Sequence, residues 1–286
     1  MTKIRKSKLG LVGIIAVVTA LALAAVVLSG CGSSSSTSSD NSDKTITVAA
    51  SPNPHADILN NAVKPLLEEQ GYTLQVEEFT DYVQPNNVTE QGEVDANYFQ
   101  HQPYLDNFNE ENGTHLVSVE PVHFEPFGLY SNKIQSLDDL EDGATVAVPN
   151  DATNEARALL LLQQEGLLEL KDPEDINATI NDITSNPKNL QFKEVEAASV
   201  STILDDVDLA AINGNYALEA GFTVNEDALA VESADSVAGQ TYANVLVVKD
   251  GNQDSEKIKA LADALHSDEV RNYINDTYKG AVVPEF

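Results

Sequence analysis

An apolar run over residues 9–28 limits where the folded body of this 286-residue chain can begin. The segment before the run is basic at four positions, and no acidic residue occurs before Asp40: the basic residues are Lys3, Arg5, Lys6 and Lys8. A basic segment followed by an apolar stretch and small residues is the pattern of a secretory signal. A run of this length could also span a bilayer, so a permanent transmembrane anchor is the competing interpretation.

The end of the apolar run favours the secretory interpretation. Leu28-Ser29-Gly30-Cys31 resembles a bacterial lipobox, in which the cysteine receives a diacylglycerol before the signal is cleaved. We therefore predict a lipoprotein signal peptide at residues 1–30 and lipidation at Cys31. Because Cys31 is the only cysteine, a disulfide within the chain, a cysteine-rich zinc site and an iron–sulfur cluster are excluded.

A Ser-rich tract follows the cysteine. Residues 32–43 contain no apolar residue and therefore cannot bury anything against a core. We predict a flexible tether at residues 31–44, with a reach of about 20 Å by random-coil scaling. The folded part is expected to begin near Lys44.

The charge of the chain excludes one class of partner. Lys and Arg total 16 against 46 Asp and Glu, which gives a formal net charge of -30. Such a surface repels nucleic-acid phosphates and anionic lipid headgroups, so we predict no nucleic-acid partner. Membrane attachment must then be covalent or hydrophobic.

Strand and helix patterns alternate along the body, which predicts an α/β fold with mostly parallel sheets. The strands are expected at residues 45–50, 74–79, 94–99, 116–122, 128–130, 144–149, 190–195, 209–213 and 244–248. Helices are expected at residues 55–69, before 94, at 103–112, 154–165, 199–205, 254–266 and 268–278, and from an N-cap at Ser136.

Five long blocks of the body resemble the methionine-binding lipoproteins of the NlpA family, the substrate receptors of methionine ABC importers. The blocks are FTDYVQPN at residues 79–86, VDANYFQHQPYLD at 94–106, VAVPNDATNEARALLLLQ at 146–163, LDDVDLAAINGNYA at 204–217 and YANVLVV at 242–248. The resemblance implies a two-lobe periplasmic-binding-protein fold, type II-like, with a ligand cleft between the lobes. It places lobe one at residues 45–127 plus 242–286 and lobe two at 128–241.

The resemblance also implies a function. It predicts a lipid-anchored protein on the extracytoplasmic face of the cell membrane that binds methionine and delivers it to an ABC permease driven by its ATPase. No cofactor, metal or catalytic residue is expected. The chirality of the ligand stays open, as does the choice among methionine, its sulfoxide, methionyl dipeptides and other small amino acids.

Arg157 is the candidate for the ligand carboxylate. A guanidinium offers a bidentate fork to a carboxylate, and the first turns of the predicted helix add favourable partial positive charge. Asn154 lies three residues earlier on the same helix face. The alternative is a surface arginine paired with Glu155 or Asp151.

The other candidates are two asparagines and an aromatic group. Asn213 and Asn244 each lie at the end of an apolar strand, where simple turn chemistry is the alternative. In the family the matching asparagines face the polar end of the ligand. A thioether packs well against rings, which favours a side-chain pocket formed by Tyr82, Phe99, His101 and Tyr104. Glu125 departs from the pattern of familiar relatives and leaves the ligand preference open.

Two other classes of protein are weighed against this interpretation. The chain has no Gly-x-Ser-x-Gly elbow, phosphate loop or HExxH helix, which argues against an enzyme. A metal-binding receptor would need three of the five histidines to converge, and His101, His115 and His123 are the set considered. A surface adhesin is the remaining alternative.

Overall fold

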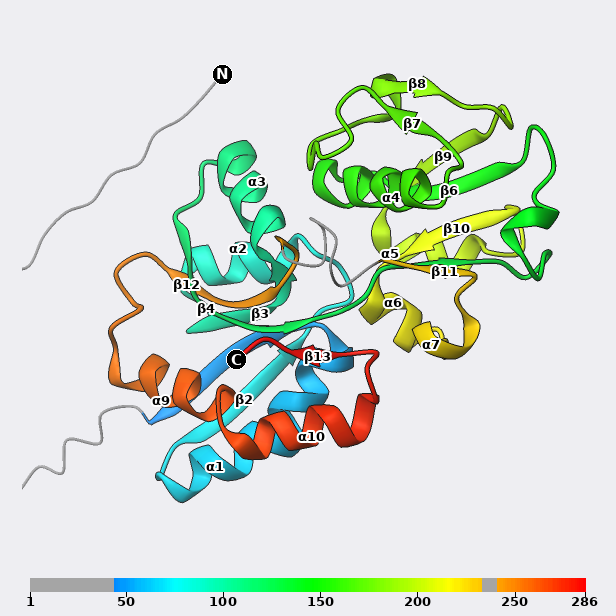
Figure 1. The fold of residues 1–286 in the computed structure, drawn as a ribbon. Helices are drawn as coiled ribbons and strands as arrows, with labels where there is room; N and C mark the ends of the chain where they lie inside the picture. The colour runs from blue at the N-terminus through cyan, green and yellow to red at the C-terminus, as the bar shows by residue number, and fades with distance from the viewer. Residues whose placement is uncertain (1–43, 233–240) are drawn as a thin grey trace, which may run out of the picture. The chain divides into compact units, whose positions relative to one another are not determined.

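The computed structural model describes residues 44–232 and 241–286, which are built around two main β-sheets (Figure 1). The predicted signal peptide, Cys31 and nearly all of the predicted tether lie outside the described residues. Among the described helices, none is both long and apolar enough to cross a membrane. The predicted α/β fold class is confirmed.

The first sheet has six strands in the order β13-β4-β12-β3-β1-β2. Their bounds are β1 Thr45–Ala50, β2 Thr73–Glu78, β3 Ala96–His101, β4 Leu116–Phe124, β12 Asn244–Lys249 and β13 Val283–Pro284. Helices α1 (Lys64–Glu69), α9 (Glu256–Leu265) and α10 (Asp268–Tyr278) share a core with this sheet, which includes Val48, Leu246 and Leu261. Helices α2 (Gln84–Gln91) and α3 (Gln102–Asn112) also contact it.

The second sheet has five strands in the order β11-β5-β10-β6-β9. Their bounds are β5 Gly128–Tyr130, β6 Thr145–Pro149, β9 Gln191–Val195, β10 Leu209–Ile212 and β11 Ala230–Val231. Both faces are covered: helix α4 (Ala152–Gln164) contributes to one core, and α5 (Ala197–Val200) and α6 (Gly214–Glu219) to another. Burial on both faces explains why the central strands read as continuous apolar runs. Smaller elements are α7 (Val224–Asp227) and the pair β7 (Glu169–Leu170) and β8 (Ile183–Ser185).

The expectation of mostly parallel sheets is wrong. In the first sheet β1 pairs with β2 and β3 in parallel, but β12 runs antiparallel to both β3 and β4, and β13 antiparallel to β4. In the second sheet β5 runs antiparallel to β10 and β11. The chain passes from the first sheet to the second between Phe124 and Gly128, and it returns between Val231 and Asn244. The strands at these crossings therefore come from the other sheet. They are not connected to their neighbours by the helical crossover that parallel pairing requires.

The helix predicted over residues 55–69 is present, but it is not α-helical throughout. The chain forms wide π-type turns over Pro52–Ala56 (η1) and Leu59–Val63 (η2), and a regular α-helix only over α1. Asn53 within the first of these has extended backbone angles, φ -124° and ψ 141°. Two prolines around Asn53 remove backbone donors and disfavour the helical conformation, so the helix pattern in the sequence does not begin as a regular helix.

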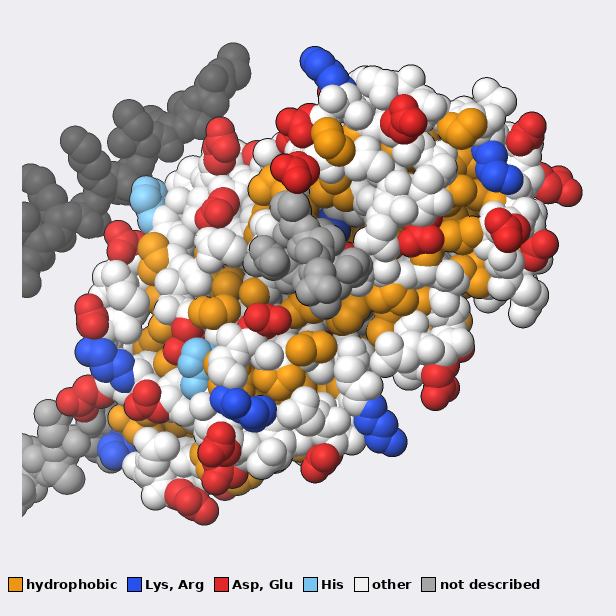
Figure 2. Space-filling view, viewed as in Figure 1, with side chains coloured by type: hydrophobic (Ala, Val, Ile, Leu, Met, Phe, Trp, Pro, Cys, Tyr) orange, Lys and Arg blue, Asp and Glu red, His pale blue; other side chains and the backbone are white. Residues whose placement is uncertain are grey.

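The predicted acidic surface is visible in the space-filling view. Asp and Glu side chains are scattered over the whole face shown in Figure 2, whereas Lys and Arg occur there as isolated side chains. Several basic residues are engaged by neighbouring acids, such as Lys257 with Asp95 at 3.2 Å. Exposed pairs of this kind contribute little to stability.

Candidate functional site

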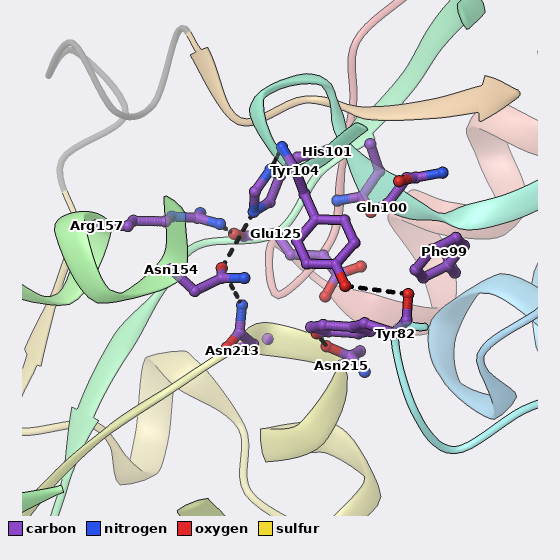
Figure 3. A pocket seen from close by; sticks show the side chains of 12 residues that line it. Tyr82, Phe99, Gln100, His101, Tyr104, Glu125, Asn154, Arg157, Asn213 and Asn215 are labelled. Atoms are coloured by element: carbon purple, nitrogen blue, oxygen red, sulfur yellow. Dashed lines mark hydrogen bonds between the residues drawn. The ribbon is translucent and has the colours of Figure 1, made fainter. Parts of the chain in front are cut away.

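A small cavity of about 20 Å³ lies between side chains that the two sheets supply (Figure 3). All eight residues that the sequence predicts for a ligand site line it: Tyr82, Phe99, His101, Tyr104, Asn154, Arg157, Asn213 and Asn244. Four further residues line it as well, Gln100, Glu125, Gly214 and Asn215. The cavity is therefore polar on the side of the amides and Arg157 and aromatic on the side of Tyr82 and Phe99.

An irregularity in strand β3 puts three consecutive residues on the cavity wall. Val245 of β12 pairs with Gln100, but the next residue, Leu246, pairs with Tyr98, so Phe99 is skipped in the ladder. A bulge of this kind breaks the alternation of side chains. Phe99 and His101 both line the cavity as alternation predicts, and Gln100 lines it too because of the bulge.

The aromatic wall is centred on Tyr82. Its ring centroid lies 5.8 Å from that of Phe99, 5.6 Å from that of Tyr104 and 5.0 Å from that of Tyr216. The hydroxyl of Tyr82 donates to Asn215 Oδ1 at 2.5 Å, and the hydroxyl of Tyr104 donates to the backbone carbonyl of Tyr82 at 3.1 Å. These bonds fix the ring orientations, so the apolar wall has a defined shape.

A chain of hydrogen bonds begins at the N-cap of α4. Asp151 Oδ1 accepts from the backbone N–H of Asn154 at 3.1 Å and from its side-chain amide at 2.9 Å. The side-chain oxygen of Asn154 is therefore an acceptor. It accepts hydrogen bonds from Asn213 Nδ2 at 2.7 Å and from His101 Nε2 at 3.1 Å. His101 Nδ1 accepts the backbone N–H of Tyr104, so its proton is on Nε2. The N-cap of α4 thus fixes the orientation of the polar side chains on this wall of the cavity.

Arg157 is buried, with 3% of its side chain exposed, and its carboxylate partner is Glu232. Nη2 lies 2.6 Å from Glu232 Oε2, and Nε lies 3.0 Å from Glu232 Oε1. Nη2 also donates to the backbone carbonyl of Glu125 at 2.8 Å. Burial lowers the pKa of the guanidinium, but Glu232, together with Tyr242 and Glu125, outweighs it and the net shift is upward. The alternative of a surface arginine paired with Glu155 or Asp151 is wrong.

A second buried cluster is formed by His55, His123 and Glu125, of which Glu125 lines the cavity. His123 Nε2 donates to Glu125 Oε1 at 2.8 Å, and Tyr98 bonds the other ring nitrogen of His123. His55 Nε2 lies 3.4 Å from Glu125 Oε1 and donates to Asn244 Oδ1 at 3.0 Å. The donor atoms of the three residues lie within 4.8 Å of one another, close enough for a metal, yet they are already engaged in these bonds.

Burial biases each member of this cluster toward its neutral form. It lowers the pKa of His55 to about 4 and that of His123 to about 3, and it raises the pKa of Glu125. Burial also lowers the pKa of His101, to about 3. At neutral pH all three imidazoles are therefore uncharged.

The histidine set weighed for a metal in the sequence, His101, His115 and His123, is wrong. The side chain of His115 is 74% exposed and bonds Glu90, whereas His101 and His123 are buried. The sequence did not single out His55 or Glu232. His55 follows a Pro-Asn-Pro segment without a strand or helix pattern, and Glu232 is 75 residues from Arg157, so no local spacing signalled either contact.

Comparison with known proteins gives a consistent family. The sequence profile of the NlpA lipoproteins matches residues 46–286. The methionine-binding lipoprotein MetQ of Bacillus subtilis is 44% identical over 245 residues, which is 84% of this chain and 88% of that protein. A nutrient-binding protein of Burkholderia cenocepacia, solved bound to methionine, is 42% identical with a TM-score of 0.80 and covers 84% of this chain and 100% of its own. A solved lipoprotein of Ruminococcus gnavus is 56% identical with a TM-score of 0.83 and covers 85% of this chain and 100% of its own. The chain belongs to the NlpA lipoprotein family.

Proposed function

We propose that this protein binds methionine, or a close analogue, and delivers it to an ABC importer. The observation that carries the proposal is the composition of the cavity, in which a buried Arg157 and ordered amides face an aromatic wall. A free amino acid presents a carboxylate, an ammonium and a side chain, and this cavity offers a complementary group for each. The methionine-binding names of the relatives support the same ligand.

The eight lining residues are assigned roles on this basis. Arg157 holds the carboxylate, Asn154, Asn213 and Asn244 order and contact the polar groups, and Tyr82, Phe99, His101 and Tyr104 enclose the side chain. A thioether sulfur about 5 Å from an aromatic ring gains roughly 0.3–1.5 kcal/mol, which favours methionine over norleucine. The groups serve recognition rather than bond making, so the protein acts as a receptor and not as an enzyme.

The lobe assignment follows from the same proposal. Residues 45–127 plus 242–286 form lobe one around the first sheet, and residues 128–241 form lobe two around the second. The ligand contacts both, so its binding favours the arrangement in which both walls are in place. The permease and ATPase of an importer are the proposed partners of the liganded protein.

The ligand assignment is tested by thermal unfolding of residues 44–286 after bound ligand has been stripped by unfolding and refolding. A ligand at a hundred times its Kd stabilises the native state by about 2.7 kcal/mol. For a chain of this size we expect methionine to raise the Tm by roughly 5–10 °C. If methionine, its sulfoxide and methionyl dipeptides all leave the melting curve unchanged, the ligand assignment is wrong. Glycine and glutamate serve as control ligands.

The anchoring site is tested by Cys31→Ser. We expect the variant to accumulate as uncleaved precursor or to leave the membrane fraction, because the serine oxygen cannot form the thioether to diacylglycerol. The measurement is membrane fractionation combined with labelling by a radioactive fatty acid, with Ser33→Ala as the matched control. A processed, lipid-labelled Cys31→Ser protein in the membrane fraction would contradict an anchor at this residue and place it elsewhere.

A further inference from the structure

We propose that Glu125, together with Asn213, accepts the ammonium group of the ligand, so that the cavity has an acceptor side for the ammonium and a donor side for the carboxylate. This inference rests on the proposed function, since it assigns the two charged ends of an amino acid to opposite groups of the same cavity. Two features of the cavity support this assignment: the donor and acceptor directions of its hydrogen bonds, and the charges of the buried side chains around it.

The donor side is formed by Arg157 and Asn244. His55 Nε2 donates to Asn244 Oδ1 at 3.0 Å. The oxygen of the Asn244 amide therefore faces His55, on the side away from the cavity. The Asn244 amide therefore offers Nδ2, a donor, to the cavity that it lines. Arg157 is a donor by its chemistry. Both groups suit a carboxylate, and neither can accept a hydrogen bond from an ammonium at these positions.

Asn213 has the opposite orientation. Its Nδ2 donates to Asn154 Oδ1 at 2.7 Å, so the acceptor Oδ1 is the atom left over. Asn213 is 5% exposed, and its Oδ1 has no hydrogen-bond partner among residues 44–232 and 241–286. A buried acceptor without a partner costs free energy, and an incoming N–H donor removes that cost.

Glu125 lies next to this acceptor. A Cβ placed on Gly214, the residue after Asn213, would come within 2.7 Å of Glu125 Cβ and 2.8 Å of Glu125 Oε2. The absence of a side chain at position 214 therefore lets the carboxylate lie directly against the Asn213–Gly214 backbone. Figure 3 shows Glu125 near the middle of the cavity, between the Arg157 side and the Phe99 side.

The balance of charge leaves Glu125 in need of a cation. Arg157 is already compensated by Glu232 at 2.6 Å, and Glu125 is the one carboxylate among the described cavity-lining residues. The imidazoles of His55 and His123 beside it are neutral because burial lowers their pKa values. Burial raises the pKa of Glu125 for the same reason. Arg157 favours the ionised form of Glu125 electrostatically, but among the described residues no Lys or Arg side chain pairs with its carboxylate, so a ligand ammonium would be its direct cationic partner.

The experiment compares two ligands that differ only in the ammonium. Methionine and 4-(methylthio)butanoate, which lacks the amino group, are titrated by calorimetry into the wild-type domain, Glu125→Gln and the matched control Glu226→Gln. The glutamine amide keeps the size of the original side chain and an oxygen for the His123 N–H. Glu226 is an exposed glutamate of α7 that lies outside the cavity lining. Melting curves of both variants confirm that they fold.

We expect Glu125→Gln to weaken methionine roughly 10- to 150-fold, the range for hydrogen bonds to charged groups. It should leave 4-(methylthio)butanoate within about twofold of wild type, and Glu226→Gln should leave the affinity for both ligands unchanged. Methionine binding to Glu125→Gln at wild-type strength, or an equal loss for both ligands, would overturn the inference while methionine binding by the wild type still stands. A wild-type domain that binds neither ligand instead refutes the proposed function itself.

If Glu125→Gln does not fold, Gly214→Ala replaces it. The added methyl group displaces the carboxylate without removing its charge. The same selective loss of methionine is then expected, and equal affinities of Gly214→Ala and wild type for methionine would overturn the inference.

Discussion

Arg157→Ala is expected to lower the free energy of unfolding by about 3–5 kcal/mol, because it leaves the buried Glu232 carboxylate without its partner. At roughly 2–4 °C per kcal/mol for a chain of this size, the Tm should fall by about 6–20 °C. The guanidinium also packs against aromatic rings, with its carbon 4.5 Å from the ring centroid of Tyr242 and 5.1 Å from that of Phe127. Thermal unfolding without ligand measures this loss.

The same substitution should also weaken methionine by roughly 2–5 kcal/mol, since a buried carboxylate of the ligand would lose its charged partner. The double variant Arg157→Ala with Glu232→Gln separates the two effects. It should recover stability, because no unpaired charge remains, without recovering affinity. Lys259→Ala, at an exposed lysine 3.1 Å from Asp254, is the control and should change stability by less than about 1 kcal/mol. Wild-type affinity in the double variant would contradict the carboxylate role.

Acid is expected to destabilise the protein well before its surface carboxylates titrate. His55, His101 and His123 have folded-state pKa values of about 4, 3 and 3 because they are buried, below the ordinary value of 6.5. The unfolded chain therefore takes up protons that the folded chain does not. Stability is full above pH 6.5 and is lost as the pH falls from there toward these folded-state values, by up to about 1.4 kcal/mol per pH unit for each imidazole. Glu125 and Asp151 act against this loss of stability in acid. Burial raises their pKa values, so the folded chain takes up protons at these two carboxylates at a higher pH than the unfolded chain does.

The measurement is the free energy of unfolding from urea titrations between pH 7.5 and 4.5. His101→Asn removes one buried imidazole and retains a side chain that caps a helix, so its stability should fall less steeply with decreasing pH than that of wild type. His115→Asn, at an exposed position, should reproduce the wild-type slope. Identical slopes for His101→Asn and wild type would show that this imidazole does not carry the acid sensitivity.

Local sequence patterns predicted the helices and strands better than they predicted the directions in which the strands pair. The helix expected at residues 154–165 and the strand expected at residues 144–149 are confirmed as α4 and β6, because both patterns depend on neighbours in the sequence. The directions of β5 and β12 depend on where the chain crosses between sheets, which no local pattern records. The helix expected at residues 55–69 is present, but the spacing of its apolar residues did not indicate that it is π-helical up to Ala56 and over Leu59–Val63.

The site shows the same division. Family resemblance predicted eight site residues in five separated blocks, and all eight line one cavity. The spacing of these residues in the sequence would not have predicted this grouping. The contacts that set their charge and orientation were missed: Glu232 beside Arg157, and His55 behind Asn244. Each joins segments far apart in the chain through side chains whose partners are visible only once the fold is known.

The hydrogen bonds that span the cavity also govern how fast a ligand can be exchanged. Tyr82 bonds Asn215, the hydroxyl of Tyr216 bonds the carbonyl of Thr80 at 3.1 Å, and His101 bonds Asn154, each joining a residue near the first sheet to one near the second. A ligand bound in this cavity, as proposed above, would be released only after these bonds break. Its residence time is therefore limited by the opening rate of the protein, and tight retention follows even where the equilibrium contacts to the ligand are modest.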